Sequence, residues 1–167
     1  MRKAAIILSI LTLIVGACGQ NNTKQLPPTN EQGQTEIDKR NVINVYLDDH
    51  DQLFVNDSLM DITNLRSRIK DFFDIHSEGL EYPEKDFEDI PGLGIIKVNK
   101  NAFIAFKNEL STLYMFFVQV LDELHQSFYE LRNELSIERF GKTFNNCSEE
   151  EQKAVEKVYP LAISEKR

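Results

Sequence analysis

The side chains that could bind a metal ion are few and scattered along the chain. The three histidines stand at distant positions, without a second histidine at ligand spacing: His50, His76 and His125. The best metal candidate is a run of four consecutive residues, Asp48, Asp49, His50 and Asp51. This run lacks the Asp-x-Asp-x-Asp-Gly order and the distal glutamate of a calcium loop. We therefore interpret it as a solvated turn and predict neither a metal site nor a cofactor.

Motifs for nucleophilic catalysis or phosphate binding are equally weak. Gly92 and Gly94 lack the third glycine and the lysine of a phosphate-binding loop, and no Gly-x-Ser-x-Gly motif occurs. Cys147 lies beside glutamates, which disfavour the thiolate form that a catalytic cysteine needs. The acidic side chains of residues 78–89 are interpreted as a hydrated loop. We thus expect no enzyme, and an enzyme acting through this acidic loop is the least favoured hypothesis.

Composition limits the classes of protein that remain. The chain has 167 residues, a formal net charge of −8 and a pI of about 4.9. This length suits one folded domain with a hydrophobic core. The negative charge argues against binding to nucleic acid, which requires clustered Lys and Arg. Two cysteines cannot form a disulfide-rich scaffold or a four-cysteine zinc site.

The first eighteen residues resemble a bacterial lipoprotein signal. Arg2 and Lys3 precede an apolar run over residues 4–15, which is about 18 Å long as a helix, shorter than the ~30 Å hydrocarbon core of a bilayer. Small residues then stand directly before Cys18, as in proteins that are cleaved and lipidated at this cysteine. The alternatives are an ordinary cleaved signal, with Cys18 as an unmodified residue, and an uncleaved membrane anchor.

The resemblance divides the chain into three parts. Residues 1–17 are expected to be a signal peptide, residues 18–40 a lipidated flexible tether, and residues 41–167 the folded domain. Cleavage before Cys18 removes Arg2 and Lys3 and changes the formal net charge from −8 to −10. Because Gly19 and not Asp follows Cys18, we expect a lipid-anchored, periplasm-facing protein of the outer membrane of a Gram-negative-type bacterium.

Periodicity predicts the elements of the first half of the domain. Alternating apolar residues indicate strands over residues 43–47 and 53–56, joined as a hairpin. Apolar residues at helical spacing then predict a helix from residue 62 to residue 73, with Asp61 or Ser58 as the N-cap. Pro83 and Pro91 predict a loop over residues 77–94. Two short strands are expected over residues 94–98 and 102–107.

The second half is expected to be mainly helical. A continuous apolar stripe predicts a long helix from Thr112 to Gly141, and the stripe consists of Leu113, Phe116, Phe117, Val120, Leu121, Leu124, Phe128, Leu131 and Leu135. Ser148 and Glu151 form the pattern of a capping box that opens a short helix ending near residue 158. An edge strand over residues 161–163 follows. The expected fold is α+β, with two main helices on one face of a small mixed sheet and a short C-terminal helix and strand.

Some aromatic and aliphatic side chains lie off the stripe of the long helix. Most of the aromatic residues are expected in the core: Phe103, Phe106, Tyr114, Phe116, Phe117, Phe128 and Tyr129. Tyr114, Met115 and Val118, however, extend the apolar surface beyond the stripe. An apolar surface outside the core is typical of a site that contacts a partner. The sequence therefore favours a binding module over a catalyst.

Residues 42–165 resemble the periplasmic domain of the ExbD/TolR family of biopolymer-transport proteins. The matching segments are INVYLDDHDQLFVNDSLMDITNLRSRIK, VQVLDELHQSFYELRNEL, FGKTF and SEEEQKAVEKVYPLAISE. The resemblance implies two helices packed on one side of a small mixed sheet. It also implies a homodimer, partners such as TonB- or TolA-like proteins or motor components, and in some members binding to peptidoglycan.

The chain differs from the family in the segment that carries the family's membrane function. Members cross the inner membrane once, and an acidic residue in that helix serves proton movement. Residues 1–15 contain no Asp or Glu, and a proton relay needs an ionisable group within the membrane. Relatives also carry an Asn-Asp-Arg-like turn before the long helix, where this chain has Leu110 in place of the basic residue. No functional residue of the family is therefore transferred to this chain.

These features lead to one main hypothesis and one alternative. The main hypothesis is a lipid-anchored, non-catalytic component or accessory of a TonB/Tol-type envelope transport system, which acts by protein–protein interaction or homodimerisation. The alternative is a lipoprotein that binds peptidoglycan and tethers the membrane to the cell wall. Lipidation of Cys18 is the only modification that the sequence predicts.

Overall fold

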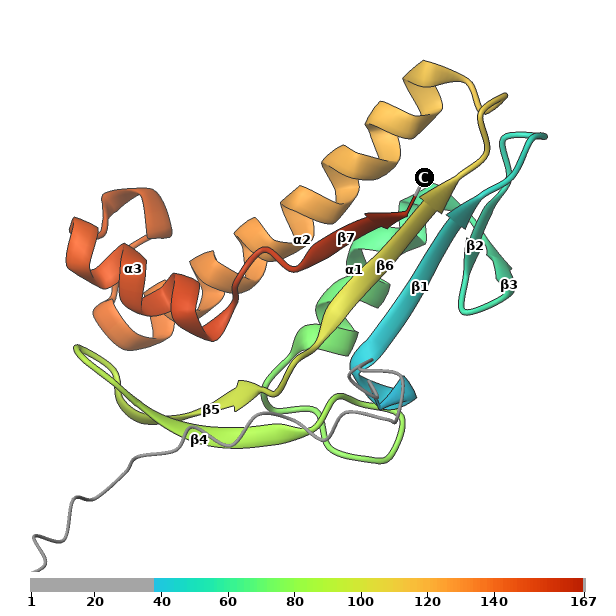
Figure 1. The fold of residues 1–167 in the computed structure, drawn as a ribbon. Coiled ribbons are helices and arrows are strands. Elements are labelled where there is room, and N and C mark those ends of the chain that lie inside the picture. Colours follow the sequence, from blue (N-terminus) through green and yellow to red (C-terminus); the bar gives the residue numbers. More distant parts are fainter. Residues whose placement is uncertain (1–37, 167) are drawn as a thin grey trace, which may run out of the picture. The chain divides into compact units, whose positions relative to one another are not determined.

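The computed structural model describes residues 38–166, which form an α+β fold with three helices (Figure 1). The strands are β1 (Val42–Leu47), β2 (Leu53–Val55), β3 (Ser58–Met60), β4 (Lys85–Ile90), β5 (Gly94–Asn99), β6 (Phe103–Asn108) and β7 (Ile163–Lys166). The helices are α1 (Ile62–Phe73), α2 (Tyr114–Phe140) and α3 (Glu149–Val158), with 3-10 turns η1 (Lys39–Asn41) and η2 (Phe144–Asn146). The sequence predicted this fold class correctly.

Five strands form a mixed sheet in the order β3-β2-β1-β6-β7. β1 pairs in parallel with β6 and antiparallel with β2, while β7 pairs in parallel with β6. Alternate side chains of the central strands point to one face, where Ile43, Val45 and Leu47 of β1 are completely buried. This alternation follows from the two-residue period of a strand, so one face of the sheet carries the core.

Helices α1 and α2 cover that buried face. Leu65 and Ile69 of α1 and Val120, Leu124 and Phe128 of α2 belong to the same hydrophobic cluster as the buried residues of β1. α1 also packs along α2, and the ring of Phe73 lies 4.8 Å from that of Phe128, measured between centroids. The two-helix layer predicted from the apolar stripes is therefore present.

Helix ends follow the predicted local signals. The Asp61 carboxylate accepts a hydrogen bond of 2.8 Å from the backbone N–H of Thr63, which identifies Asp61 as the N-cap of α1. Gly141 ends α2 in the left-handed conformation, with a φ of 68°. Ser148 and Glu151 form the reciprocal hydrogen bonds of a capping box at the start of α3.

The region of residues 77–94 differs from the prediction. A loop was expected, but Lys85–Ile90 is strand β4 and pairs antiparallel with β5 in a separate two-stranded sheet. Pro83 and Pro91 lie outside this strand, one before it and one after it, so neither removes a ladder hydrogen bond. Only Ile90 of β4 is buried, and an acidic sequence can therefore form this strand.

Two further strands differ from their predicted form. β3 was not expected; it follows β2 after the two-residue turn Asn56-Asp57, in which both residues have positive φ angles of 47° and 63°. The C-terminal strand was predicted over residues 161–163, whereas β7 begins at residue 163. β7 is nevertheless the edge strand that was expected, since it pairs only with β6. Within residues 38–166, no helix combines the length and the apolar character needed to cross a bilayer.

Candidate interaction surface

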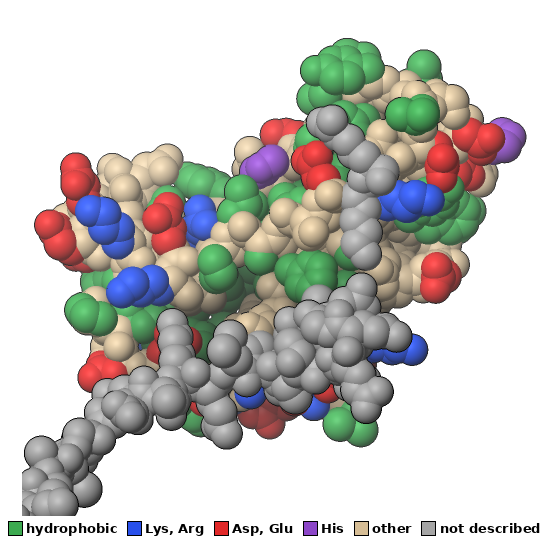
Figure 2. All heavy atoms as spheres, viewed as in Figure 1, with side chains coloured by type: hydrophobic (Ala, Val, Ile, Leu, Met, Phe, Trp, Pro, Cys, Tyr) green, Lys and Arg blue, Asp and Glu red, His purple; other side chains and the backbone are tan. Residues whose placement is uncertain are grey.

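A group of exposed apolar side chains surrounds the junction of β6 and α2. We call this group the apolar patch, and it consists of Leu110, Leu113, Tyr114, Met115 and Val118. Tyr114 is 75% exposed and Met115 is 68% exposed, far more than the buried residues of the same helix. Figure 2 shows hydrophobic side chains gathered at the end of the domain where Figure 1 places the start of α2. Large apolar side chains that remain in water together mark a binding surface.

Helical spacing brings the patch together. Tyr114 and Val118 are four residues apart, and Met115 and Val118 are three apart, so all three share one face of α2. The aromatic residues behind this face connect the patch to the core. The ring of Tyr114 stacks on Phe117 at 6.5 Å, and Phe117 stacks on the buried Phe106 at 5.6 Å. The patch is therefore supported by packed side chains.

Hydrogen bonds fix the backbone that carries the patch. The N–H of Glu109 donates to the carbonyl of Leu47 at 3.0 Å, and the Thr112 hydroxyl donates to the carbonyl of Asp48 at 3.0 Å. The N–H of Leu113 donates to the Asp51 carboxylate at 2.8 Å. These bonds connect the β6–α2 junction to the β1–β2 turn. Backbone that is already held by such bonds lowers the entropic cost of binding a partner.

Charged groups next to the patch hold defined ionisation states. Glu109 accepts hydrogen bonds from Lys107 at 3.1 Å and from the Tyr46 hydroxyl at 2.9 Å, and these bonds lower the pKa of Glu109. The same bond to Glu109 raises the pKa of Tyr46, which remains a neutral phenol. Glu109 is thus an anion at neutral pH, directly before the exposed side chain of Leu110.

The Asp48–Asp51 run forms the predicted turn between β1 and β2. One oxygen of Asp48 accepts the N–H groups of His50 and Gln52 at 2.9 and 2.8 Å. The ring nitrogen Nδ1 of His50 lies 2.6 Å from the carboxylate of Asp49. Asp51 faces the first turn of α2. Turn geometry thus accounts for Asp48 and the start of α2 for Asp51. Asp48, Asp49 and His50 also bring one possible ligand atom each within 4.8 Å of one another.

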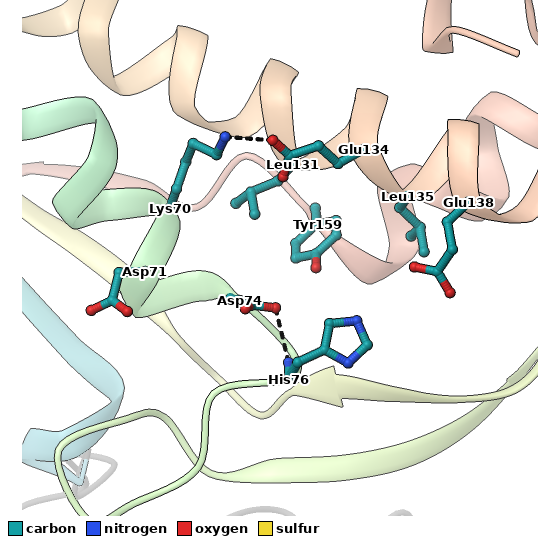
Figure 3. A pocket seen from close by; sticks show the side chains of 9 residues that line it. All are labelled: Lys70, Asp71, Asp74, His76, Leu131, Glu134, Leu135, Glu138 and Tyr159. Atoms are coloured by element: carbon teal, nitrogen blue, oxygen red, sulfur yellow. Dashed lines mark hydrogen bonds and ion pairs between the residues drawn. The ribbon is translucent and has the colours of Figure 1, made fainter.

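A second cluster of charged residues joins α1 to α2, and Figure 3 shows one of its ion pairs, between Lys70 and Glu134. Lys70 donates to Glu130 at 2.8 Å and to Glu134 at 2.6 Å, while Arg66 donates to Glu123 and Glu130. Beside Lys70 lies a cavity of about 340 Å³, whose wall includes the buried ring of Tyr159. Burial raises the pKa of Tyr159, so its hydroxyl stays protonated. The cations here are neutralised within the fold, and we assign this cluster to the packing of the two helices.

Of the two cysteines, only Cys147 can be placed relative to this surface. Cys18, the predicted lipidation site, lies outside the described residues. Cys147 is buried after η2, and its thiol contacts the carbonyl of Thr143 at 3.5 Å. Cys147 is therefore part of the packing around the 3-10 turn and lies outside the apolar patch.

The sequence identified part of the apolar patch. Tyr114, Met115 and Val118 were predicted to extend beyond the core stripe, and all three are exposed. Leu113 was placed in the stripe, which is wrong, because it is the N-cap of α2 and is 63% exposed. Leu110, three residues earlier, is also fully exposed, at the position where the sequence departs from the pattern of the family that it resembles. The apolar residues in the turn before α2 were the sequence signal that could have added Leu110 and Leu113 to the predicted surface.

Comparison with models of known protein families finds no match, and no curated protein is significantly similar to the chain. The apolar patch, its acidic surroundings and the sequence before residue 38 are therefore the features from which function can be inferred.

Proposed function

We propose that the chain is a lipid-anchored, non-catalytic component or accessory of a TonB/Tol-type envelope transport system and acts by protein–protein contact. Two features support this proposal. The leader ends in small residues before Cys18, as in lipoproteins. The domain then presents its apolar patch at a junction that three hydrogen bonds connect to the β1–β2 turn. Of these features, the exposed patch is the observation that carries the proposed contact.

The resemblance to the ExbD/TolR periplasmic domain gives the proposal its cellular setting. The folded chain contains two helices on one face of a mixed sheet, an arrangement that agrees with what the resemblance implies. A fold of this kind serves many functions, and it does not by itself assign one. We place the contact at the apolar patch because binding is favoured when a partner covers exposed apolar side chains and removes them from water.

Capture of partners from crosslinked envelopes tests this proposal. The native chain is expected to recover a motor component or a TonB/TolA-like protein, and Met115→Glu to reduce recovery about tenfold, because a buried carboxylate is costly in an interface. Phe87→Glu is the matched control, since Phe87 is 67% exposed on β4 and lies outside the patch. Equal recovery with both variants, or no transport component with the native chain, would contradict the proposal. Sedimentation with purified sacculi tests the alternative, peptidoglycan binding.

A further inference from the structure

A groove opens between the β2–β3 hairpin, the start of α1 and the first turn of α2. Its volume is about 440 Å³, which lies within the range of ligand-binding pockets. Apolar side chains from all three elements form its lining: Leu53, Met60, Ile62 and Phe116. Asp51 and Asp61 stand at its rim. We call this feature the acidic groove.

The acidic groove continues the apolar patch. Asp51 at the rim accepts the N–H of Leu113, which belongs to the patch. Phe116 lines the groove, and its N–H donates to the carbonyl of Leu113 at 3.0 Å. A partner segment that lies across Leu113 can therefore place a side chain in the groove.

Two of the segments around the groove, the hairpin with its preceding turn and the start of α2, contain no Lys or Arg. Residues 48–61 and 109–118 contain no Lys or Arg and six acidic residues, which are Asp48, Asp49, Asp51, Asp57, Asp61 and Glu109. Hydrogen bonds from the side chain and N–H of Thr63 lower the pKa of Asp61, so this rim carboxylate stays ionised. The nearby cations Arg66 and Lys70 of α1 are paired with glutamates of α2. Glu109 is likewise paired with Lys107 at 3.1 Å, whereas no ion pair within residues 38–166 involves Asp51 or Asp61, so the charge of these two carboxylates is left for an external cation.

We infer that the acidic groove receives a cationic amphipathic segment of a partner protein, with an apolar side chain in the cavity and Lys or Arg side chains beside Asp51 and Asp61. The inference rests on the proposed function, because it names the kind of partner that the contact surface accepts. Burial of the apolar side chain supplies free energy, and the opposite charges favour this partner over acidic ones.

The same charges disfavour other occupants. A second copy docked symmetrically would place this acidic rim against its own equivalent. Like charges that face each other across an interface repel and weaken the complex. An anionic membrane surface would be repelled for the same reason. The charge distribution therefore selects a basic partner over a second copy or a lipid surface.

Two substitutions with the same chemical change separate the groove from the rest of the surface. Leu59→Lys alters the groove, because Leu59 lines it and is 64% exposed on β3. Ile95→Lys is the matched control, because Ile95 is 76% exposed on β5 and lies outside the groove. Each removes an exposed aliphatic side chain from a strand and adds one positive charge, so both variants are expected to fold.

The probe is a short amphipathic peptide of Leu and Lys, added to the full-length chain in zwitterionic nanodiscs, with empty nanodiscs as the blank. We expect Leu59→Lys to weaken its binding about tenfold and Ile95→Lys to leave it unchanged. A peptide with each Leu replaced by Ser keeps the charge and should bind about tenfold more weakly to the native chain. Equal binding of both variants, or equal binding of both peptides, would overturn the inference.

Envelope capture with the same two variants distinguishes this inference from the proposed function. If Leu59→Lys still recovers the transport component, the groove is not the contact and only this inference fails. If the native chain recovers none, the proposed function fails, while the peptide measurement still decides the groove. A dimer in sedimentation that Leu59→Lys dissociates would assign the groove to a second copy and contradict the inference.

Discussion

Lys85 connects the two-stranded sheet to the end of α1. Its ammonium group donates to the carbonyl of Asp74 at 3.0 Å and to the side chain of Asn99. The amide of Asn99 in turn donates to the carbonyl of Phe73. Side chains of β4 and β5 therefore satisfy carbonyls that the last turn of a helix leaves without partners. Burial lowers the pKa of Lys85 to about 8, although the nearby charge of Asp74 opposes this shift.

This lowered pKa predicts a pH dependence of stability. Between pH 8 and 10 the folded chain releases the Lys85 proton while the unfolded chain retains it, so the unfolded state binds more protons. The contribution of Lys85 to the free energy of unfolding must then increase with pH in this range. Denaturant unfolding measures the free energy of unfolding of the native chain and of Lys85→Met. The native value minus the Lys85→Met value should increase from pH 8 to pH 10. For the exposed control Lys100→Met, the difference in the free energy of unfolding from the native chain should stay constant with pH. A constant difference for Lys85→Met would refute the prediction.

At the scale of the elements, Gly141 determines where the longest helix ends. Its φ of 68° lies in the left-handed region, and its N–H donates to the carbonyl of Ile137 at 3.0 Å. Apart from Gly141 itself and its two chain neighbours, no heavy atom of residues 38–166 lies within 4 Å of the position that a Cβ would occupy. The cost of a side chain at this position is therefore conformational and involves no collision.

Gly141→Ala should lower the free energy of unfolding by about 1 kcal/mol, because a Cβ is disfavoured in the left-handed conformation. Denaturant titration monitored by circular dichroism measures this change. Gln119→Ala, at an exposed position within α2, should change stability by less than about 0.5 kcal/mol. A loss for Gly141→Ala no larger than that of the control would show that the helix end does not depend on this conformation.

The accuracy of the element predictions depended on how local their signals are. α1, α2 and α3 were predicted because the spacing of apolar residues and the caps at Asp61, Gly141 and Ser148 lie within the helices or at their ends. β4 was missed because its conformation depends on pairing with β5 and not on a buried face of its own. β3 has three residues, and the Asn56-Asp57 turn was its only local signal.

The candidate site shows the same limit. Tyr114 and Met115 could be recognised as surface residues from their helical phase. The acidic groove could not be predicted, because it combines Leu53, Met60 and Phe116 from three separate elements. The β1–β2 turn could also be predicted from the sequence. The hydrogen bond from the N–H of Leu113 to the Asp51 carboxylate could not, because the two residues are 62 positions apart in the chain. Contacts of this range depend on the completed fold.

At the scale of the whole molecule, the net charge agrees with the proposed lipid anchor. Removal of residues 1–17 would leave a net charge of −10, which disfavours direct contact with anionic lipid headgroups. The acyl chains on Cys18 would then hold the protein at the membrane, since two or more chains anchor a protein stably. The domain would remain free to present its apolar patch and acidic groove to a basic partner.

Mass spectrometry of the N-terminus tests the central proposal, that Cys18 carries a lipid anchor. The account predicts a chain that begins at Cys18, lacks residues 1–17 and carries a diacylglyceryl group on the cysteine sulfur. A Cys18→Ser chain, prepared in parallel, should retain residues 1–17 and carry no lipid. An intact native chain that begins at Met1 with an unmodified Cys18 would contradict the account.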